Sequence, residues 1–153
     1  MKIKDVMTTD PKTCTPQTSF AEAAHLMLEG DCGILPVVED GRIVGVVTDR
    51  DMYIALATRN KLASQIAVGE VGLKTTFTCE PEDDVHLALE MMKERRVRRL
   101  PVVGFGGTVM GIVSMNDLVL AAGARKPVRE TEVVDTLHAI CAHHAPAPHV
   151  VAA

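Results

Sequence analysis

Aromatic side chains are scarce in this sequence, which has no tryptophan, one tyrosine and three phenylalanines among 153 residues. Surfaces that bind single-stranded nucleic acid usually stack the bases on several aromatic rings, so this chain has little to build one from. Basic residues are not in excess either, because 16 Lys and Arg stand against 20 Asp and Glu and the net charge is −4. Duplex nucleic acid is therefore not an expected partner, since its binders neutralise phosphates with a basic surface.

Long apolar runs and closely spaced cysteine pairs are also absent. No apolar run approaches the ~20 residues needed to cross a bilayer, and the opening letters MKIKD hold no apolar signal core. We therefore expect a cytoplasmic protein with no membrane partner. The cysteines are too scattered for C-x-x-C zinc pairs and too few for a disulfide framework, so we expect reduced thiols at Cys14, Cys32, Cys79 and Cys141.

What the sequence does contain is an internal repeat, and a repeat determines the architecture. The segments Leu35–Val38 and Leu100–Val103 both read LPVV and lie at an offset of 65 residues. One inserted residue then raises the offset to 66, which aligns Gly45–Asp51 with Gly111–Asp117. The sequence predicts a first unit at 1–59, a linker at 60–67, a second unit at 68–123 and a C-terminal segment at 124–153.

Each unit has the pattern β-α-β-β-α. Ser19 and Glu22 form a capping box ahead of an apolar stripe, which predicts a helix. The pair Asp40-Gly41 predicts a hairpin of strands 34–38 and 43–47, and Thr48 is placed to cap a helix over 49–58. The second unit repeats this pattern with strands at 100–103 and 109–113 and a helix at 116–122. Apolar residues at helical spacing predict an amphipathic helix over 131–143, ahead of a frayed tail at 145–153.

One motif occurs twice at a strand-to-helix turn, as GVVTDRD ending at Asp51 and as GIVSMND ending at Asp117. Helix N-terminal amides attract an anion, a hydroxyl donates to phosphate, and a carboxylate accepts hydrogen bonds from ribose hydroxyls. These are the components of a nucleotide site. The alternative is structural, because Thr48 and Ser114 also suit helix caps and acids suit the first turn of a helix.

The paired units, the LPVV segments and the two G-h-h-[ST]-x-x-D motifs together resemble a tandem pair of CBS (cystathionine-β-synthase) domains, also called a Bateman module. The resemblance covers about residues 1–123. It implies an α+β (α/β) fold in which two pseudo-symmetric β-α-β-β-α units pack sheet to sheet, with a C-terminal amphipathic helix added. It also implies that adenosine-type ligands bind in the clefts between the units.

The resemblance further implies roles for particular residues. In the motifs, the carboxylates hold the ribose hydroxyls and the hydroxyls assist at ribose or phosphate; these residues are Asp51, Thr48, Asp117 and Ser114. Arg98 and Arg99 are the phosphate candidates, and Arg50 is a further candidate inside the first motif. The adenine slots involve Thr13, Cys14, Ile34 and Pro36 in one unit and Thr78, Cys79 and Pro101 in the other.

The resemblance thus implies a regulatory sensor without catalysis that signals occupancy to an unknown regulated protein by a conformational change, and that forms a homodimer. AMP, ADP and ATP are the expected ligands, while NAD and S-adenosylmethionine carry the same adenosine half; no cofactor is required. Two other classes stay open. One is a protein-interaction or single-stranded nucleic-acid adaptor without a small ligand, and the other is an enzyme such as an adenylate-processing hydrolase.

Two kinds of chemistry have little support in the residues. Zinc-type ligands gather near the C-terminus, but their spacing fits no closed tetrahedral pattern, so no metal site is expected; these residues are His138, Cys141, His143, His144 and His149. His25 and His86 belong to no recognisable catalytic triad motif, and the sequence has no P-loop.

Overall fold

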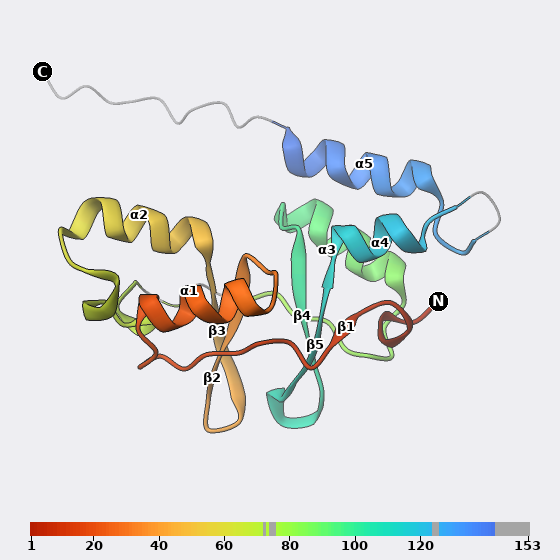
Figure 1. Ribbon diagram of the computed structural model, residues 1–153. Helices are drawn as coiled ribbons and strands as arrows, with labels where there is room; N and C mark the ends of the chain where they lie inside the picture. Colours follow the sequence, from red (N-terminus) through yellow and green to blue (C-terminus); the bar gives the residue numbers. More distant parts are fainter. Residues whose placement is uncertain (72, 74–75, 124–125, 143–153) are drawn as a thin grey trace, which may run out of the picture.

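One antiparallel hairpin forms the centre of each half of the molecule (Figure 1). The computed structural model describes residues 1–71, 73, 76–123 and 126–142. In the first hairpin β2 (Ile34–Glu39) pairs with β3 (Arg42–Thr48), and in the second β4 (Arg99–Val103) pairs with β5 (Val109–Ser114). Asp40 and Gly41 turn the first hairpin with φ of 50° and 76°, the conformation that the Asp-Gly pair favours.

Two helices accompany each hairpin. They are α1 (Phe20–Glu29) and α2 (Asp49–Arg59) in the first unit, and α3 (Val85–Arg95) and α4 (Met115–Ala121) in the second. The predicted capping box at α1 is confirmed, because Glu22 N–H donates to Ser19 Oγ at 3.2 Å and Ser19 N–H donates to Glu22 Oε2 at 2.9 Å. No helix among the described residues is long and apolar enough to span a membrane.

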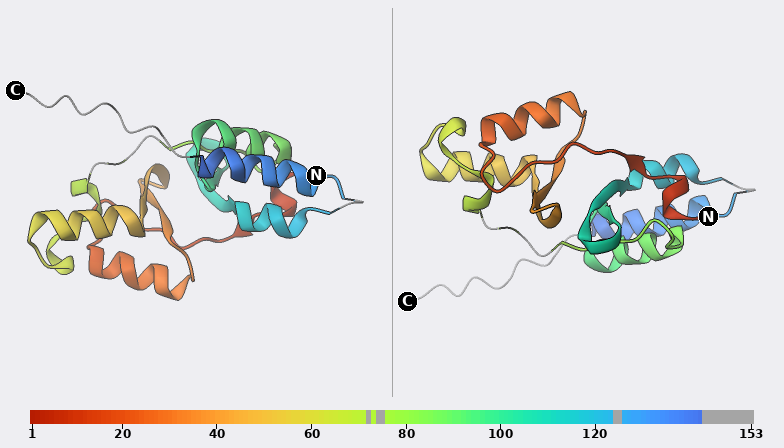
Figure 2. Two further views of the ribbon diagram at one scale, coloured as in Figure 1. Left: turned by 90° about the horizontal axis from the view of Figure 1, so that it is seen from above. Right: turned by 90° about the horizontal axis from the view of Figure 1, so that it is seen from below.

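The two units exchange their entry segments. Ile3, in a short 3-10 helix, is fully buried in the core of the second unit, and Val68 is fully buried in the core of the first. Ile3 N–H donates to Asp83 O at 2.9 Å, and the equivalent bond in the repeat joins Val68 N–H to Thr18 O, also at 2.9 Å. The chain therefore starts beside the second unit and crosses to the first (Figure 2), which ties the two units together.

The first strand predicted for each unit is reduced to a single bridge. Cys14 bridges to β2 and Cys79 to β4, each through one residue pair. Pro16 and Pro81 follow these bridges by two residues and have no N–H with which to extend a ladder. Instead, the two-residue strand β1 (Thr8–Thr9) pairs antiparallel with β5 of the second unit.

The C-terminal segment forms α5 (Glu130–Cys141), close to the predicted range of 131–143, whose last residue lies outside the described part. Val133 and Thr136 are buried where α5 packs on α3 and α4, and Leu137 and Ile140 lie against the same core. The helix therefore covers a face of the second unit, while α1 and α2 have no such cover from a described segment (Figure 1). The predicted tail at 145–153 also falls outside the described residues.

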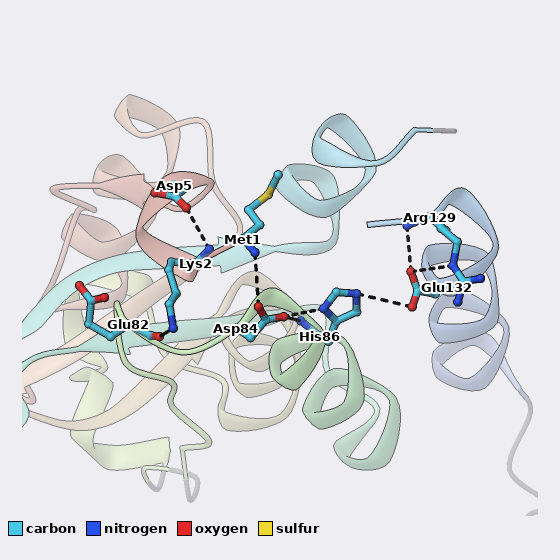
Figure 3. Close-up of polar contacts among 8 residues, drawn as sticks. All are labelled: Met1, Lys2, Asp5, Glu82, Asp84, His86, Arg129 and Glu132. Carbon is cyan, nitrogen blue, oxygen red and sulfur yellow. Dashed lines mark hydrogen bonds and ion pairs between the residues drawn. The ribbon is translucent and has the colours of Figure 1, made fainter. Parts of the chain in front are cut away.

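Polar contacts fasten α5 to α3 and to the N-terminus (Figure 3). The amino group of Met1 lies 3.3 Å from Asp84 Oδ2, and Asp84 Oδ1 accepts from the backbone N–H of His86 at 3.0 Å. The His86 ring contacts Asp84 through Nδ1 and approaches Glu132 Oε1 through Nε2 at 3.6 Å. His86 therefore connects α3 to α5.

Candidate functional site

The two repeated motifs place a carboxylate and a hydroxyl at the start of a helix. Thr48 Oγ1 donates to Asp51 Oδ2 at 2.7 Å and accepts from Asp51 N–H at 3.2 Å. Ser114 and Asp117 repeat this arrangement at 2.6 Å and 3.3 Å. The hydroxyls are therefore helix caps, as the structural interpretation predicts. Asp51 and Asp117 also line cavities, so capping and ligand binding are not exclusive here.

The motif glycines allow close packing of the chain segment that enters the other unit. A Cβ atom at Gly111 would lie 2.8 Å from the backbone oxygen of Thr8 in β1, and one at Gly45 would lie 2.7 Å from Cβ of Leu73. Both contacts are too short for a side chain in those positions. The glycine of the motif is thus explained by packing between the units.

One cavity, of about 320 Å³, contains the first motif and is called here the Asp51 cavity. Its lining comes from both units, so the site exists only where they meet. The first unit supplies Ile34, Val46, Thr48 and Asp51, and the second supplies Thr76, Phe77, Val97, Arg98, Arg99, Leu100 and Pro101. Most of the surface is apolar, with hydroxyl, carboxylate and guanidinium groups placed on it.

A second cavity, of about 220 Å³, contains the second motif and is called the Asp117 cavity. It is related to the first by the sequence repeat: Val46 is replaced by Ile112, Thr48 by Ser114, and Val97 by Cys32. The full lining is Thr8, Pro11, Lys12, Gly30, Asp31, Cys32, Ile34, Arg99, Ile112, Ser114, Asn116 and Asp117. The chain therefore forms two related but unequal cavities.

The inequality lies in a few positions. Phe77 lines the Asp51 cavity where Lys12 lines the other, and Arg95 stacks on the Phe77 ring with its guanidinium carbon 4.7 Å from the ring centroid. Arg98 corresponds in the repeat to Gly33, which lines neither cavity. The Asp51 cavity is therefore the larger and more apolar of the two. Each cavity is lined by two cations, but these stand against one carboxylate in the Asp51 cavity and against two, Asp31 and Asp117, in the other.

Eight of the sequence-predicted site residues line one or both cavities. They are Ile34, Thr48, Asp51, Arg98, Arg99, Pro101, Ser114 and Asp117. The structure combines them across the units, because Arg98, Arg99 and Pro101 of the second unit face the motif of the first. Their role in binding a nucleotide stays a prediction.

Six other predicted residues line neither cavity: Thr13, Cys14, Pro36, Arg50, Thr78 and Cys79. Cys14 and Cys79 are buried in the two cores, and burial raises the pKa of the Cys14 thiol to about 11 and that of Cys79 to about 12. Pro36 is also buried, and Arg50 is exposed on α2. For the cysteines, the strand bridge directs the side chain into the core.

Sequence reasoning missed several lining residues, above all Phe77, Val97 and Lys12. The repeat held the signal for part of this set, because Phe77 and Lys12 are equivalent at the offset of 65 residues. This equivalence did not indicate a binding site, because the residue is aromatic in one unit and charged in the other. Thr76 and Asn116 also line the cavities and were not predicted.

The charges around the cavities are unevenly paired. Arg98 Nη2 lies 3.6 Å from the sulfur of Cys141 at the end of α5, and Lys12 Nζ lies 3.1 Å from Glu29 Oε2. Arg99 is half-buried, and its guanidinium has no hydrogen bond or ion pair with any described residue. Within the described part, no group of three His, Cys, Asp and Glu side chains is placed to hold a metal ion.

Comparisons with known proteins agree with this architecture. The model of the CBS domain family matches twice, at residues 3–58 and 68–123. The CBS domain-containing protein YhcV of Bacillus subtilis is 35% identical over 118 residues, which cover 77% of this chain and 83% of YhcV.

Solved structures with the same fold hold adenosine compounds. The CBS domain pair of protein MJ0100, solved with 5′-methylthioadenosine and S-adenosyl-L-methionine, has a TM-score of 0.70 and 26% identity and covers 78% of this chain and 94% of its own. The structure of CBSX2 in complex with AMP has a TM-score of 0.67 and 29% identity, with coverage of 78% and 94%. Because the family model matches twice over most of the sequence and YhcV is 35% identical over most of both chains, the chain belongs to the CBS domain family.

Proposed function

We propose that this protein is a regulatory module that binds an adenosine nucleotide, with AMP as the first choice, in the Asp51 cavity and catalyses no reaction. One observation carries the proposal: a carboxylate and two guanidinium groups, from different units, lie on the wall of one largely apolar cavity. This combination matches a ligand that has an apolar base, a diol and a phosphate. The adenosine compounds held by MJ0100 and CBSX2 support the same class of ligand.

The lining residues divide the cavity among the parts of such a ligand. Asp51 accepts hydrogen bonds from the vicinal ribose hydroxyls, as carboxylates do in other nucleotide sites. Ile34, Val46 and Val97 supply apolar contacts for the base, with Phe77 as an aromatic surface. Arg98 and Arg99 pair with the phosphate, for which the planar guanidinium is well suited. ADP and ATP extend this arrangement by added phosphates.

Signalling follows from the position of the cavity between the units. A ligand that contacts both units favours the arrangement in which both sets of contacts are made, and its differential affinity sets the size of the shift. Arg98 also contacts Cys141, so a phosphate at Arg98 acts next to the end of α5. We propose α5 as the element that transmits occupancy to a regulated protein.

The thiols and the exposed apolar side chains indicate the cellular compartment and the oligomeric state of the module. The four free cysteines suit a reducing compartment, so we assign the protein to the cytoplasm. Apolar side chains on α1 and α2 are exposed, with Leu28 at 78% and Tyr53 at 74%. Because α5 covers the helices of the second unit, we assign a homodimer contact to α1 and α2.

Calorimetric titration tests the proposal. AMP, ADP, ATP, NAD and S-adenosylmethionine are titrated into wild-type protein, D51A and D49A at fixed salt. D49A is the matched control, because Asp49 also lies in the first turn of α2 but does not line the Asp51 cavity. The proposal requires that at least one ligand binds to wild type and D49A, and that D51A loses the binding step of the Asp51 cavity while the Asp117 cavity stays intact. Absence of binding by all five to the folded protein contradicts it and favours the adaptor function.

A further inference from the structure

Two residues lie on the boundary between the cavities. Ile34 and Arg99 line both the Asp51 cavity and the Asp117 cavity. They are equivalent at the 65-residue offset of the repeat, so the same position of each unit lies between the sites. In the first unit this position holds an apolar side chain, and in the second it holds a cation. The boundary therefore contains a single guanidinium.

Backbone pairing holds Arg99 at this boundary. It is the first residue of β4 and pairs with Ser114, the hydroxyl residue of the second motif, while Ile34 pairs in the same way with Thr48. The Arg99 side chain is half-buried, and none of the described residues forms an ion pair or hydrogen bond with its guanidinium. A partly buried charge that no described residue pairs with is costly, which favours an anionic ligand beside it.

The other cations do not take this role. Arg98 lines the Asp51 cavity alone and already contacts Cys141. Lys12 lines the Asp117 cavity alone and is paired with Glu29 at 3.1 Å. Arg99 is thus the cation that both cavities share, and it is the cation of the Asp117 cavity that no described carboxylate neutralises.

We propose that the two cavities compete for Arg99, so that a phosphorylated nucleotide in one weakens the binding of a phosphorylated nucleotide in the other. This inference rests on the proposed function, because it assumes that both cavities accept an adenosine group. The Asp117 cavity then pairs best with an adenosine compound that lacks a phosphate. The module senses the ratio of two ligands rather than the level of one.

The sign of the coupling follows from the geometry of a guanidinium. Its N–H groups form a planar fork that binds one phosphate in a bidentate manner, and turning it toward one cavity removes it from the other. Two phosphates near the same boundary also repel each other, and a cavity wall screens this repulsion less than water does. An uncharged nucleoside has no phosphate to pair with Arg99 or to repel a second ligand, so adenosine occupies both cavities independently.

Calorimetry with AMP and with adenosine as separate probes measures the coupling. D117A and D51A report the affinity of each remaining cavity alone, and wild type reports the two together. For AMP we expect the second binding step of wild type to be at least about fivefold weaker than the weaker single-cavity variant, a coupling of ordinary size. For adenosine, the wild-type isotherm equals the sum of the two single-cavity isotherms.

Two substitutions locate the coupling at Arg99. R99M keeps the aliphatic stem and removes the charge, so AMP affinity falls in both cavities and the coupling becomes smaller than that of wild type, with only the phosphate repulsion left, while adenosine binding is unchanged. R98M, the matched control, weakens AMP only in the Asp51 cavity and keeps the coupling. If R99M does not fold, R99K replaces it; a point charge without the planar fork reduces the coupling below that of wild type.

The outcomes separate this inference from the proposed function. If adenosine and AMP both bind but AMP fills the cavities independently or with positive coupling, the sharing of Arg99 is wrong and the proposed function stands. The sharing is equally wrong if D51A, with only the Asp117 cavity intact, fails to bind AMP. If neither compound binds wild type, both proposals fail.

Discussion

His86 on α3 lies between two carboxylates, with Nδ1 against Asp84 and Nε2 3.6 Å from Glu132 Oε1 on α5 (Figure 3). The backbone N–H of His86, followed by its side chain, lowers the pKa of Asp84 below its ordinary value. The pKa of Glu132 is lowered first by the backbone N–H of Arg129 and also by the nearby charges of Arg129 and His86. Folding therefore stabilises the ionised form of both carboxylates relative to the unfolded chain.

The first prediction concerns acid stability. A carboxylate with a lowered folded pKa contributes its full stability above its unfolded pKa, about 4, and loses it as the pH falls toward the folded value. We expect the free energy of unfolding to decrease below about pH 4 and this decrease to be shallower in D84N. Chemical denaturation from pH 7 to pH 3 measures it. If the free energy of unfolding falls equally with decreasing pH in wild type and D84N, the contacts assigned to Asp84 are contradicted.

The second prediction concerns the thiols. Burial raises the pKa of Cys14 to about 11 and of Cys79 to about 12, so both stay protonated and inaccessible at pH 8. Cys141 is exposed and Cys32 is half-buried. We expect a thiol reagent to modify Cys141 first, then Cys32, and to reach the other two only in denaturant. Rapid native labelling of Cys14, read by mass spectrometry, would show that the bridge segment is misplaced.

The third prediction tests the aromatic wall of the Asp51 cavity. Loss of a base-stacking aromatic typically costs about 1–3 kcal/mol, so F77A should weaken AMP binding by about tenfold. F105A is the control, because Phe105 is fully exposed at the tip of the second hairpin. Calorimetry should find F105A equal to wild type. Equal AMP affinities of F77A and wild type would place the base elsewhere.

The fourth prediction compares neighbouring residues of α5. Val133 is 4% exposed and Val134 is 61% exposed. A charge buried at position 133 should destabilise the fold by about 3 kcal/mol, whereas one at an exposed site changes stability by within about 0.5 kcal/mol. Thermal and urea unfolding of V133D and V134D measure this difference. Equal stability of the two variants would mean that α5 does not pack on α3 and α4.

Local signals explain which parts of the fold were predictable. Ser19 with Glu22, Asp40 with Gly41, and the LPVV segments act over a few residues, so the sequence indicated the helices, the hairpins and their repetition. The exchange of Ile3 and Val68 between the cores depends on contacts between distant segments. No short-range pattern marks such a contact, so the sequence assigned Ile3 to the first unit.

The candidate site also combines residues marked by a local motif with residues brought in by contacts between distant segments. Asp51 and Asp117 belong to a repeated motif and could be predicted, as could the arginines beside the second LPVV segment. The cavity wall around them is assembled across the interface between the units, and Phe77 enters it without any motif of its own. Cys14 and Cys79 lay in the predicted slots, but bridge pairing turns alternate side chains inward and buries both thiols.

The most direct test of the central claim is a filtered nuclear Overhauser experiment on protein with labelled methyl groups in the presence of saturating AMP. The account predicts contacts from the adenine H2 and H8 protons to methyl groups of Ile34, Val46 and Val97, which line the Asp51 cavity. D51A should lose these contacts, and D49A should keep them. Contacts confined to methyl groups outside the cavity, or none at saturation, would contradict nucleotide binding at Asp51.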